Sequence, residues 1–272
     1  MKPDRYGVIG QPVAHSLSPR IHTLFAQQTK QTLSYEALEV APEALTDTLK
    51  KLHAENWRGF NLTLPHKLAV AALCESVSEP AQLAGAVNTL IRTDTGWKGD
   101  NTDGVGLIRD LKTQGIIVTG KRVLLLGAGG AARGVLKPLL DEKPAELALS
   151  NRNPWKPERI AAEFKSFGNI RPATHLSLRG DRFDLIINAT SAGHDGVMPR
   201  LSADVLAQNG ACYDLSYGKP HLPFAIWARQ QNAGKIADGL GMLVEQAAAS
   251  FELWRGVRPT TVAVLGELRK AA

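Results

Sequence analysis

The sequence predicts an α/β protein of two units, one of which contains a doubly wound parallel sheet. The run at 123–126 is wholly apolar, as expected of a parallel strand buried on both faces, and a glycine-rich turn and a helix follow it. Strand-like segments at 146–153, 183–193 and 210–218 also end in polar residues and alternate with helices. With 272 residues, the chain is long enough for two compact domains.

The first hundred or so residues predict a separate α/β unit. Expected strands lie at 6–10, 33–40 and 59–64, expected helices at Ile21–Gln28 and Ala44–His53, and a hairpin at 85–93 and 97–101. The segment Asn101–Gly106 is the expected boundary, and the chain becomes helical again after Asp238. We therefore expect domains at 1–103 and 104–238, a helical segment at 239–272, and a cleft between the first two.

Composition argues against several classes of protein. The 44% hydrophobic and 21% charged residues are ordinary for a globular chain, and no apolar run approaches the ~18 residues of a membrane-spanning helix. The first residues lack the apolar core of a signal peptide, so we expect a cytoplasmic protein. The net charge of +6 is spread along the chain, which gives no support to nucleic-acid binding. Cys74 and Cys212 lie far apart and outside any CxxC motif, so we expect two reduced thiols and no metal site.

The motif GAGGAA at 127–132 indicates a dinucleotide site. It is a variant of the GxGxxG fingerprint, with Ala132 in place of the third glycine, and it follows a strand and opens a helix. Glycines let the backbone approach a pyrophosphate, and the helix N-terminus offers free amide donors and the positive end of its dipole. The residues expected at the cofactor are Gly127, Ala128, Gly129, Gly130 and Ala131. The alternative is a tight turn that binds no ligand.

The end of the next strand distinguishes NADP from NAD. NAD-binding domains usually place Asp or Glu about 20 residues beyond the glycines, where it binds the ribose 2′-hydroxyl. This chain has Asn151 and Arg152 there, followed by Asn153 and Lys156. A carboxylate would repel a 2′-phosphate, whereas an arginine can bind it through two hydrogen bonds. NADP is therefore the expected cofactor. The alternative for Arg152 is a solvated charge at a strand end.

A series of short motifs resembles those of the shikimate dehydrogenase family. They are, in order, HSLSP (15–19), NLTLPHK (61–67), GDNTDG (99–104), GAGGAA (127–132), NRN (151–153), NATSAG (188–193) and DLSYG (214–218). The resemblance covers essentially the whole chain, and the ordered set is specific although each motif alone is weak. It implies an N-terminal substrate domain, a Rossmann-type NADP-binding domain with the active site between the two, and a C-terminal helix that packs back on the first domain.

The resemblance also implies roles for individual residues. Lys67 matches the catalytic lysine, and Asp103 matches its charge partner. The residues that match substrate contacts are Ser16, Ser18, Thr63, Lys67, Asn88, Asp103, Tyr217 and Gln246, with the two serines at the substrate carboxylate. Further cofactor contacts are implied for Glu79, Thr190, Leu215 and Gly239. The two serine hydroxyls can point the same way if their segment is extended, and two turn-capping serines before Pro19 are the alternative.

The implied reaction is the reversible reduction of 3-dehydroshikimate to shikimate with NADPH, in the biosynthesis of chorismate and the aromatic amino acids. The nicotinamide delivers a hydride to the carbonyl carbon, and the ammonium of Lys67 donates a proton to the oxygen. Asp103 holds the ammonium and favours its charged form. A lone lysine would more often be a surface charge, and His66 is expected to be structural because an extended segment points it away from Lys67.

Two other interpretations remain open. A quinate/shikimate dehydrogenase is a relative that is often NAD-linked, which Asn151 and Arg152 speak against. A non-catalytic family member that senses a ligand would not need both Lys67 and Asp103, because binding alone requires no proton donor. We expect a small-molecule substrate and a monomer or homodimer.

Overall fold

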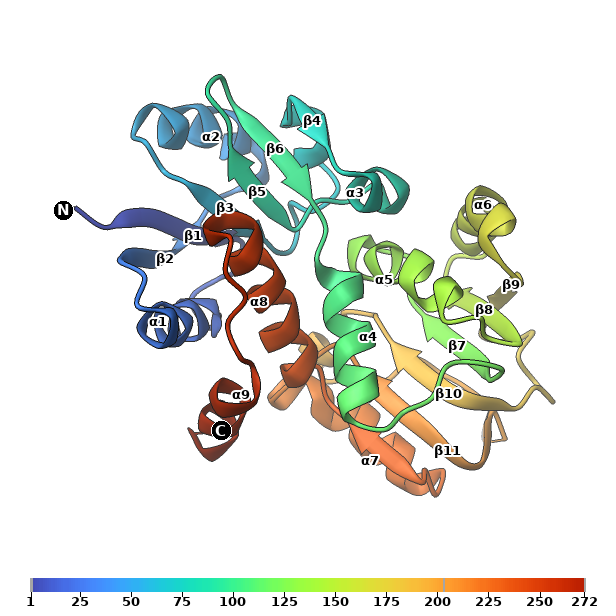
Figure 1. The fold of residues 1–272 in the computed structure, drawn as a ribbon. Helices are drawn as coiled ribbons and strands as arrows, with labels where there is room; N and C mark the ends of the chain where they lie inside the picture. The colour runs from blue at the N-terminus through green and yellow to red at the C-terminus, as the bar shows by residue number, and fades with distance from the viewer. Residues whose placement is uncertain (1, 203, 272) are drawn as a thin grey trace. The chain divides into compact units, whose positions relative to one another are not determined.

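The structure is a computed structural model that describes residues 2–202 and 204–271. It divides into two compact units (Figure 1): unit 1 comprises Met1–Gly106 and Leu243–Ala272, and unit 2 comprises Leu107–Met242. Both divisions fall inside helices, α4 (Asp103–Thr113) and α8 (Leu240–Arg255), so the chain passes between the units without a loop. Among the described residues, no helix combines the length and the apolar character needed to cross a membrane.

The sheet of unit 1 mixes parallel and antiparallel pairs. Within the described residues its order is β2-β1-β3-β5-β6-β4, with β1 parallel to β2 and β3, and with β5 antiparallel to β3 and β6. The strands are β1 (Asp4–Gly10), β2 (Leu33–Glu39), β3 (Gly59–Leu62), β4 (Ser76–Val77), β5 (Thr89–Arg92) and β6 (Trp97–Asp100). The helices other than α8 are α1 (Ser18–Thr29), α2 (Leu45–Ala54), α3 (Glu79–Ala84) and α9 (Val262–Ala271). The expected hairpin is confirmed as the pair β5 and β6.

The two faces of this sheet pack on different helices. On one face, Ile9 and Phe60 join the buried leucines of α2 in a single core. On the other face, Tyr6 and Tyr35 pack with the rings of α1 and with Trp254 of α8. Side chains alternate between the faces along each strand, so the polar residues next to Phe60 and Leu90 point toward α8.

His22 of α1 is buried on the face that α8 covers. Its ring stacks on that of Tyr35, with 4.2 Å between the ring centroids, and meets Phe25 edge-on at 5.9 Å. Among the described residues, neither ring nitrogen has a hydrogen-bond partner of good geometry. Burial lowers the pKa of His22 from 6.5 to about 3, and the nearby Asn61 side chain offsets only part of this effect. The imidazole is therefore neutral in the folded protein at neutral pH.

We expect the free energy of unfolding to fall as the pH drops below 6.5, because the unfolded chain then binds a proton that buried His22 does not. The folded-state pKa of about 3 places this loss between pH 6.5 and pH 3. One proton changes the free energy of unfolding by about 1.4 kcal/mol per pH unit, so His22 lowers this free energy by about 2 kcal/mol between pH 6.5 and 5. Urea unfolding should show a flatter pH dependence for His22→Leu than for the wild type, and no such change for His194→Gln at an exposed histidine. Parallel curves for the wild type and His22→Leu would contradict this account.

Unit 2 is built on a parallel sheet. Within the described residues its order is β12-β11-β10-β7-β8-β9, and every neighbouring pair is parallel. The strands are β7 (Arg122–Leu126), β8 (Glu146–Asn151), β9 (Ile170–Thr174), β10 (Phe183–Asn188), β11 (Leu206–Asp214) and β12 (Lys235–Ala237). Its helices other than α4 are α5 (Gly130–Asp141), α6 (Trp155–Phe164) and α7 (Leu222–Gln230). The predicted doubly wound sheet is confirmed, whereas the edge strands β9 and β12 lack the apolar runs that would have predicted them.

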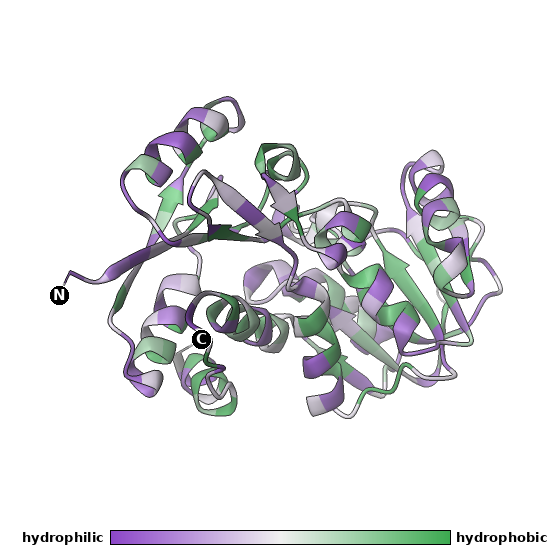
Figure 2. Ribbon diagram, turned by 45° about the horizontal axis from the view of Figure 1, so that its top comes forward, coloured by the Kyte–Doolittle hydropathy of each residue, from purple (hydrophilic) through white to green (hydrophobic). Residues whose placement is uncertain are grey.

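Helices cover both faces of this sheet, as a parallel sheet requires. Val123 and Leu125 belong to the core beneath α4, α5 and α6, and Leu124 and Leu126 belong to the core beneath α7. All four side chains are 0% exposed. Figure 2 shows the strands of this sheet in green among helices that carry purple outer surfaces. The continuous apolar run in the sequence therefore reflects burial on both faces.

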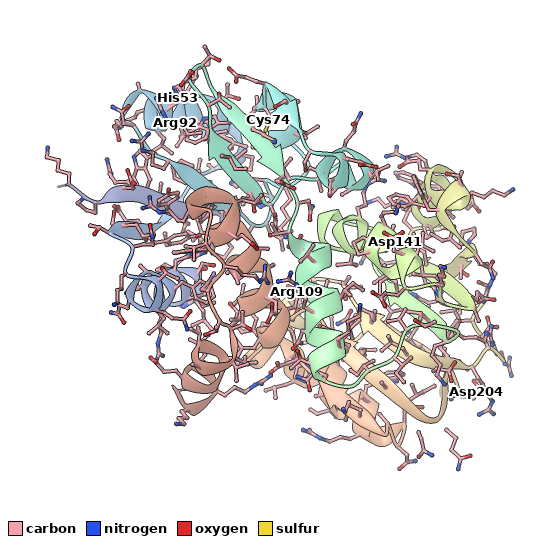
Figure 3. All side chains as sticks on the ribbon, in the orientation of Figure 1. His53, Cys74, Arg92, Arg109, Asp141 and Asp204 are labelled. Carbon is pink, nitrogen blue, oxygen red and sulfur yellow. The ribbon has the colours of Figure 1, made fainter. Side chains whose placement is uncertain are left out.

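The two cysteines are free thiols in different units. Cys74 lies next to β4 (Figure 3), and Cys212 is buried in β11. The thiol of Cys74 donates to the carbonyl of Val70. Burial raises the pKa of Cys74 to about 11 and that of Cys212 to about 12. Both therefore remain protonated at neutral pH and pack as small apolar groups.

Candidate active site

Lys67 and Asp103 form an ion pair in unit 1. Nζ of Lys67 lies 2.5 Å from Oδ2 of Asp103, and the two side chains are 17% and 5% exposed. Lys67 stands in the turn segment after β3, where its carbonyl accepts a hydrogen bond from the amide of Val87 at 2.8 Å. Asp103 is the first residue of α4, and its amide donates to Oδ1 of Asn101 at 3.0 Å. The backbone of both residues is therefore fixed by hydrogen bonds, while the Lys67 side chain stays partly accessible.

Asn88 and Gln246 join this ion pair. Nδ2 of Asn88 donates to Oδ1 of Asp103 at 2.8 Å and lies 3.3 Å from Oε1 of Gln246. Asn88 immediately precedes β5 and Gln246 is on α8, and their exposed fractions are 2% and 7%. The structure thus brings together four residues for which the resemblance implied substrate contacts: Lys67, Asn88, Asp103 and Gln246.

The serine segment forms a turn and a helix start, so the expected extended conformation is wrong. Ser18 is the first residue of α1, and Leu17 before it has φ −81° and ψ −8°. Pro19 explains this geometry, because proline favours the first turn of a helix. The oxygen of Ser16 accepts from the amide of Ser18 at 3.2 Å. Ser18 is 4% exposed, whereas Ser16 is only partly buried, so Ser16 is the more accessible serine.

Thr63 and Tyr217, the remaining predicted substrate contacts, belong to different units. Thr63 follows β3, where its amide donates to the carbonyl of Ile9 at 3.0 Å. A Cβ at Gly10 would lie 2.3 Å from the Thr63 methyl group, so the close approach of these segments requires glycine. Tyr217 is half-buried between β11 and the 3-10 helix Lys219–His221.

Polar side chains that the sequence analysis did not single out lie beside this cluster. Asn61, Thr89 and Ser250 are each 5% exposed or less, and Nδ2 of Asn61 reaches Thr89 Oγ1 at 3.2 Å and Ser250 Oγ at 2.9 Å. The sequence offered a signal for Asn61, a polar residue among the apolar residues of its strand, but none for Ser250. His66 lies in a turn and not in an extended segment, but it is buried and its Nε2 lies 2.8 Å from the carbonyl oxygen of Val40, in agreement with a structural role.

The glycine turn after β7 fits a bound dinucleotide. Gly127 has φ +111°, and a Cβ there would lie 2.8 Å from the carbonyl oxygen of Ala189. Gly129 is the N-cap of α5 and carries no capping side chain. A Cβ added at this position would meet no atom within 4 Å. Gly130 and Ala131 begin this 12-residue helix, so its first amides are approachable from the turn that Ala128 and Gly129 complete. Such a helix end suits a pyrophosphate.

The end of β8 carries no carboxylate among residues 151–157. Oδ1 of Asn151 accepts from the amide of Arg152 at 2.7 Å, which fixes the turn that leaves the strand. The side chain of Arg152 is exposed, and Asn153 after it is half-buried. Nζ of Lys156 lies 5.7 Å from the ring centroid of Trp155. Two cations beside amide side chains suit a phosphate monoester better than a neutral hydroxyl.

The other predicted cofactor residues follow strands of unit 2, except Glu79. Thr190 follows β10, and its amide and hydroxyl both donate to Oδ1 of Asn188, at 3.1 and 2.7 Å. Leu215 follows β11, and a Cβ at Gly239 would lie 2.1 Å from the Leu215 carbonyl oxygen. Glu79 is exposed at the first position of α3 in unit 1. The carboxyl ends of parallel strands meet at one edge of a sheet, which is where ligands of such sheets bind.

Family models match most of the chain. The shikimate dehydrogenase substrate binding domain matches residues 8–90, the shikimate / quinate 5-dehydrogenase model matches residues 111–212, and the shikimate 5′-dehydrogenase C-terminal domain matches residues 239–269. A shikimate dehydrogenase (NADP(+)) of Aeromonas salmonicida (strain A449) is 51% identical over 268 residues, with 98% of each chain covered. The chain belongs to the shikimate dehydrogenase family.

Solved structures share the fold of this shikimate dehydrogenase family member. The shikimate 5-dehydrogenase of Thermus thermophilus, in complex with NADP(H) and shikimate, matches with a TM-score of 0.87 at 35% identity, covering 99% of this chain and 100% of that one. An Ael1 enzyme from Pseudomonas putida matches with a TM-score of 0.90 at 43% identity, covering 97% and 98%. The fold class predicted from the sequence is therefore confirmed.

Proposed function

We propose that this chain catalyses the reversible, NADP-dependent reduction of 3-dehydroshikimate to shikimate, on the route to chorismate and the aromatic amino acids. The observation that carries the proposal is the ion pair of Lys67 with Asp103, with Asn88 bonded to the same carboxylate. A proton donor held by a carboxylate and flanked by amide groups suits the reduction of a hydroxylated ketone. The names of the relative in Aeromonas salmonicida and of the Thermus thermophilus complex support this substrate and this cofactor.

Lys67 supplies the proton in the proposed reaction. Bound NADPH contributes the hydride to the carbonyl carbon. The ammonium of Lys67 donates a proton to the ketone oxygen, and its amine takes a proton from the shikimate hydroxyl in the reverse direction. Oδ2 of Asp103 holds the ammonium while Oδ1 accepts from Asn88, so the carboxylate is fixed at both oxygens. No other side chain needs to move a proton in this scheme.

The substrate combines a carboxylate with ring hydroxyls, and we assign different groups to each. Ser16 and Ser18 are assigned to the carboxylate, Thr63, Asn88 and Asp103 to the hydroxyls, and Tyr217 and Gln246 to further contacts. The oxygen of Ser16 accepts from the amide of Ser18, which leaves the Ser16 hydroxyl proton available for a carboxylate. Ser16 is therefore the serine on which carboxylate binding chiefly depends.

The cofactor is assigned to unit 2. Gly127, Ala128, Gly129, Gly130 and Ala131 are assigned to the pyrophosphate, Asn151, Arg152, Asn153 and Lys156 to the 2′-phosphate end, and Thr190, Leu215, Gly239 and Glu79 to the remaining contacts. The exposed guanidinium of Arg152 and the uncapped start of α5 support these assignments. The proposal retains 1–103 as the substrate domain, 104–238 as the NADP domain and 239–272 as the C-terminal segment, in a cytoplasmic monomer or homodimer.

An assay of both directions tests the proposed function. The purified protein should oxidise NADPH with 3-dehydroshikimate and should use NADH with about tenfold or more lower kcat/KM, because NADH lacks the phosphate assigned to Arg152. In reverse it should oxidise shikimate with NADP+. Equal oxidation of quinate with NAD+ would favour the quinate/shikimate dehydrogenase alternative. Binding of shikimate without any turnover would favour the ligand sensor.

Ser16→Ala is expected to raise KM for shikimate about tenfold with little change in kcat, because it removes one hydrogen bond to a charged carboxylate. Steady-state kinetics and thermal unfolding together measure this effect, with Ser76→Ala at an exposed serine of β4 as the control. The affinity for NADP+ should stay unchanged. A lowered Tm with an unchanged KM would show that Ser16 only caps the turn.

A further inference from the structure

We propose that Thr89 is a positioning residue whose hydroxyl fixes the carboxamide of Asn88, so that the amide NH2 group of Asn88 faces Asp103. The inference rests on the proposed function, in which Asp103 holds the proton donor Lys67. Thr89 is 0% exposed at the start of β5. It is therefore suited to act through Asn88 and not through contact with a substrate.

The orientation of the Asn88 carboxamide follows from its partners. The backbone amide of Thr102 lies 2.9 Å from Oδ1 of Asn88, and a backbone amide can only donate. The atom facing it must therefore be the carboxamide oxygen. The NH2 group at the other end then meets Oδ1 of Asp103 at 2.8 Å, which is an acceptor. A flipped carboxamide would place its NH2 group against the Thr102 amide and its oxygen against a carboxylate.

The Thr89 hydroxyl stabilises this orientation. A hydroxyl has one proton, and Oγ1 of Thr89 donates it to Oδ1 of Asn88 at 2.8 Å. The same oxygen accepts from Nδ2 of Asn61 at 3.2 Å and lies 2.8 Å from Oγ of Ser250. Oδ1 of Asn61 in turn accepts from the hydroxyl of Tyr35 at 2.8 Å, which directs the Asn61 NH2 group toward Thr89. Every donor in this chain has an acceptor, so the Asn88 carboxamide cannot flip without breaking bonds behind it.

The fold supplies this arrangement. Asn61 on β3 and Thr89 on β5 are direct partners in the antiparallel pair, and Ser250 lies on α8. All three side chains are buried, so water cannot replace a lost hydrogen bond without entering the core. Loss of the Thr89 hydroxyl would remove one donor to Oδ1 of Asn88 and leave the amide and hydroxyl of Thr102, at 2.9 and 3.3 Å. The carboxamide would then be held less firmly, and with it the bond from Nδ2 that fixes Oδ1 of Asp103.

Kinetics of hydroxyl variants test the inference. Thr89→Val keeps the β-branched shape and removes only the hydroxyl, and it should lower kcat for shikimate oxidation about tenfold. Thr89→Ser should recover turnover to within about twofold, and Ser250→Ala should fall between the two because Asn61 still donates to Thr89. Thr46→Val at an exposed position of α2 is the matched control. Full turnover of Thr89→Val would overturn the inference.

A double-mutant cycle separates positioning from a general structural effect. If Thr89 acts through Asn88, Thr89→Val should cause no further loss of kcat in the Asn88→Ala background. A second, additive loss of about tenfold there would overturn the inference.

A crystal structure of Thr89→Val gives a readout that does not depend on turnover. The contact between Asn88 Nδ2 and Asp103 Oδ1, 2.8 Å in the wild type, should be lost or replaced by alternate rotamers of Asn88. An unchanged contact would overturn the positioning role, whatever the activity. A wild-type protein that does not oxidise shikimate with NADP+ would refute the proposed function alone, and this structural comparison would still decide the role of Thr89.

Discussion

Lys67→Ala is expected to retain shikimate binding and to lose turnover by about 10²–10⁴-fold, the usual contribution of a general acid–base group. The reason is the proposed role of the ammonium as proton donor, since it lies 2.5 Å from Oδ2 of Asp103 and its side chain is still 17% exposed. Steady-state kinetics give kcat, and calorimetric titration with shikimate gives the binding constant. The two measurements separate loss of the proton donor from loss of the substrate site.

Three further variants sharpen this result. Lys67→Arg should not restore turnover, because a guanidinium keeps the charge but cannot release its proton at working pH. Asp103→Asn should lower kcat and raise KM together, since its carboxylate is assigned to Lys67 and to a substrate hydroxyl. Lys98→Ala, at an exposed lysine of β6, should leave both parameters unchanged. Turnover of Lys67→Ala within a few-fold of the wild type would make Lys67 a surface charge and remove the proposed mechanism.

Arg152→Ala is expected to raise KM for NADPH about ten- to hundredfold and to change NADH use little. The guanidinium is exposed at the end of β8, where no acid occurs among residues 151–157, so it is free to bind the 2′-phosphate in the fork geometry that suits it. The dissociation constants of NADP+ and NAD+, measured by quenching of protein fluorescence, should show the same difference without turnover.

The matched control for Arg152 is Arg159→Ala. Arg159 is exposed on α6, the helix that follows, and pairs with Glu163 at 3.4 Å. Arg159 carries the same charge as Arg152. Its removal therefore tests whether the loss of any cation on this surface weakens NADP binding by reducing the long-range attraction. The assignment of the 2′-phosphate to Arg152 would be contradicted if Arg152→Ala raised KM equally for NADPH and NADH. It would also be contradicted if Arg152→Ala and Arg159→Ala raised KM for NADPH equally.

The strands that the sequence predicted most clearly lie between two other strands and are covered on both faces. The residues of β7 at 123–126 are 0% exposed, and a run of apolar residues is the pattern that such burial requires. Strands β9 and β12 lie at the two edges of the same sheet, where one side needs no partner strand and polar residues are tolerated. Their sequences, IRPAT and KIA, therefore carry little strand signal.

The serine segment shows how a local rule can mislead. Alternation along an extended segment predicted that Ser16 and Ser18 point the same way. Pro19 instead belongs to the first turn of α1, so the segment bends before it and Ser18 is buried at the start of the helix. The sequence contained this signal, because proline is common at the start of helices.

The sequence by itself determined the α/β class, the glycine turn after β7 and the lack of an acid after β8, because each depends on residues within one short segment. Only the tertiary structure decided which polar side chains share hydrogen bonds. Asn88 meets Gln246, 158 positions away, and Thr89 meets Ser250, 161 positions away, because the register of β3 with β5 and the packing of α8 bring them together. Hydrogen bonds act only over about 3 Å, so no spacing in the chain could have selected these partners before the fold placed them.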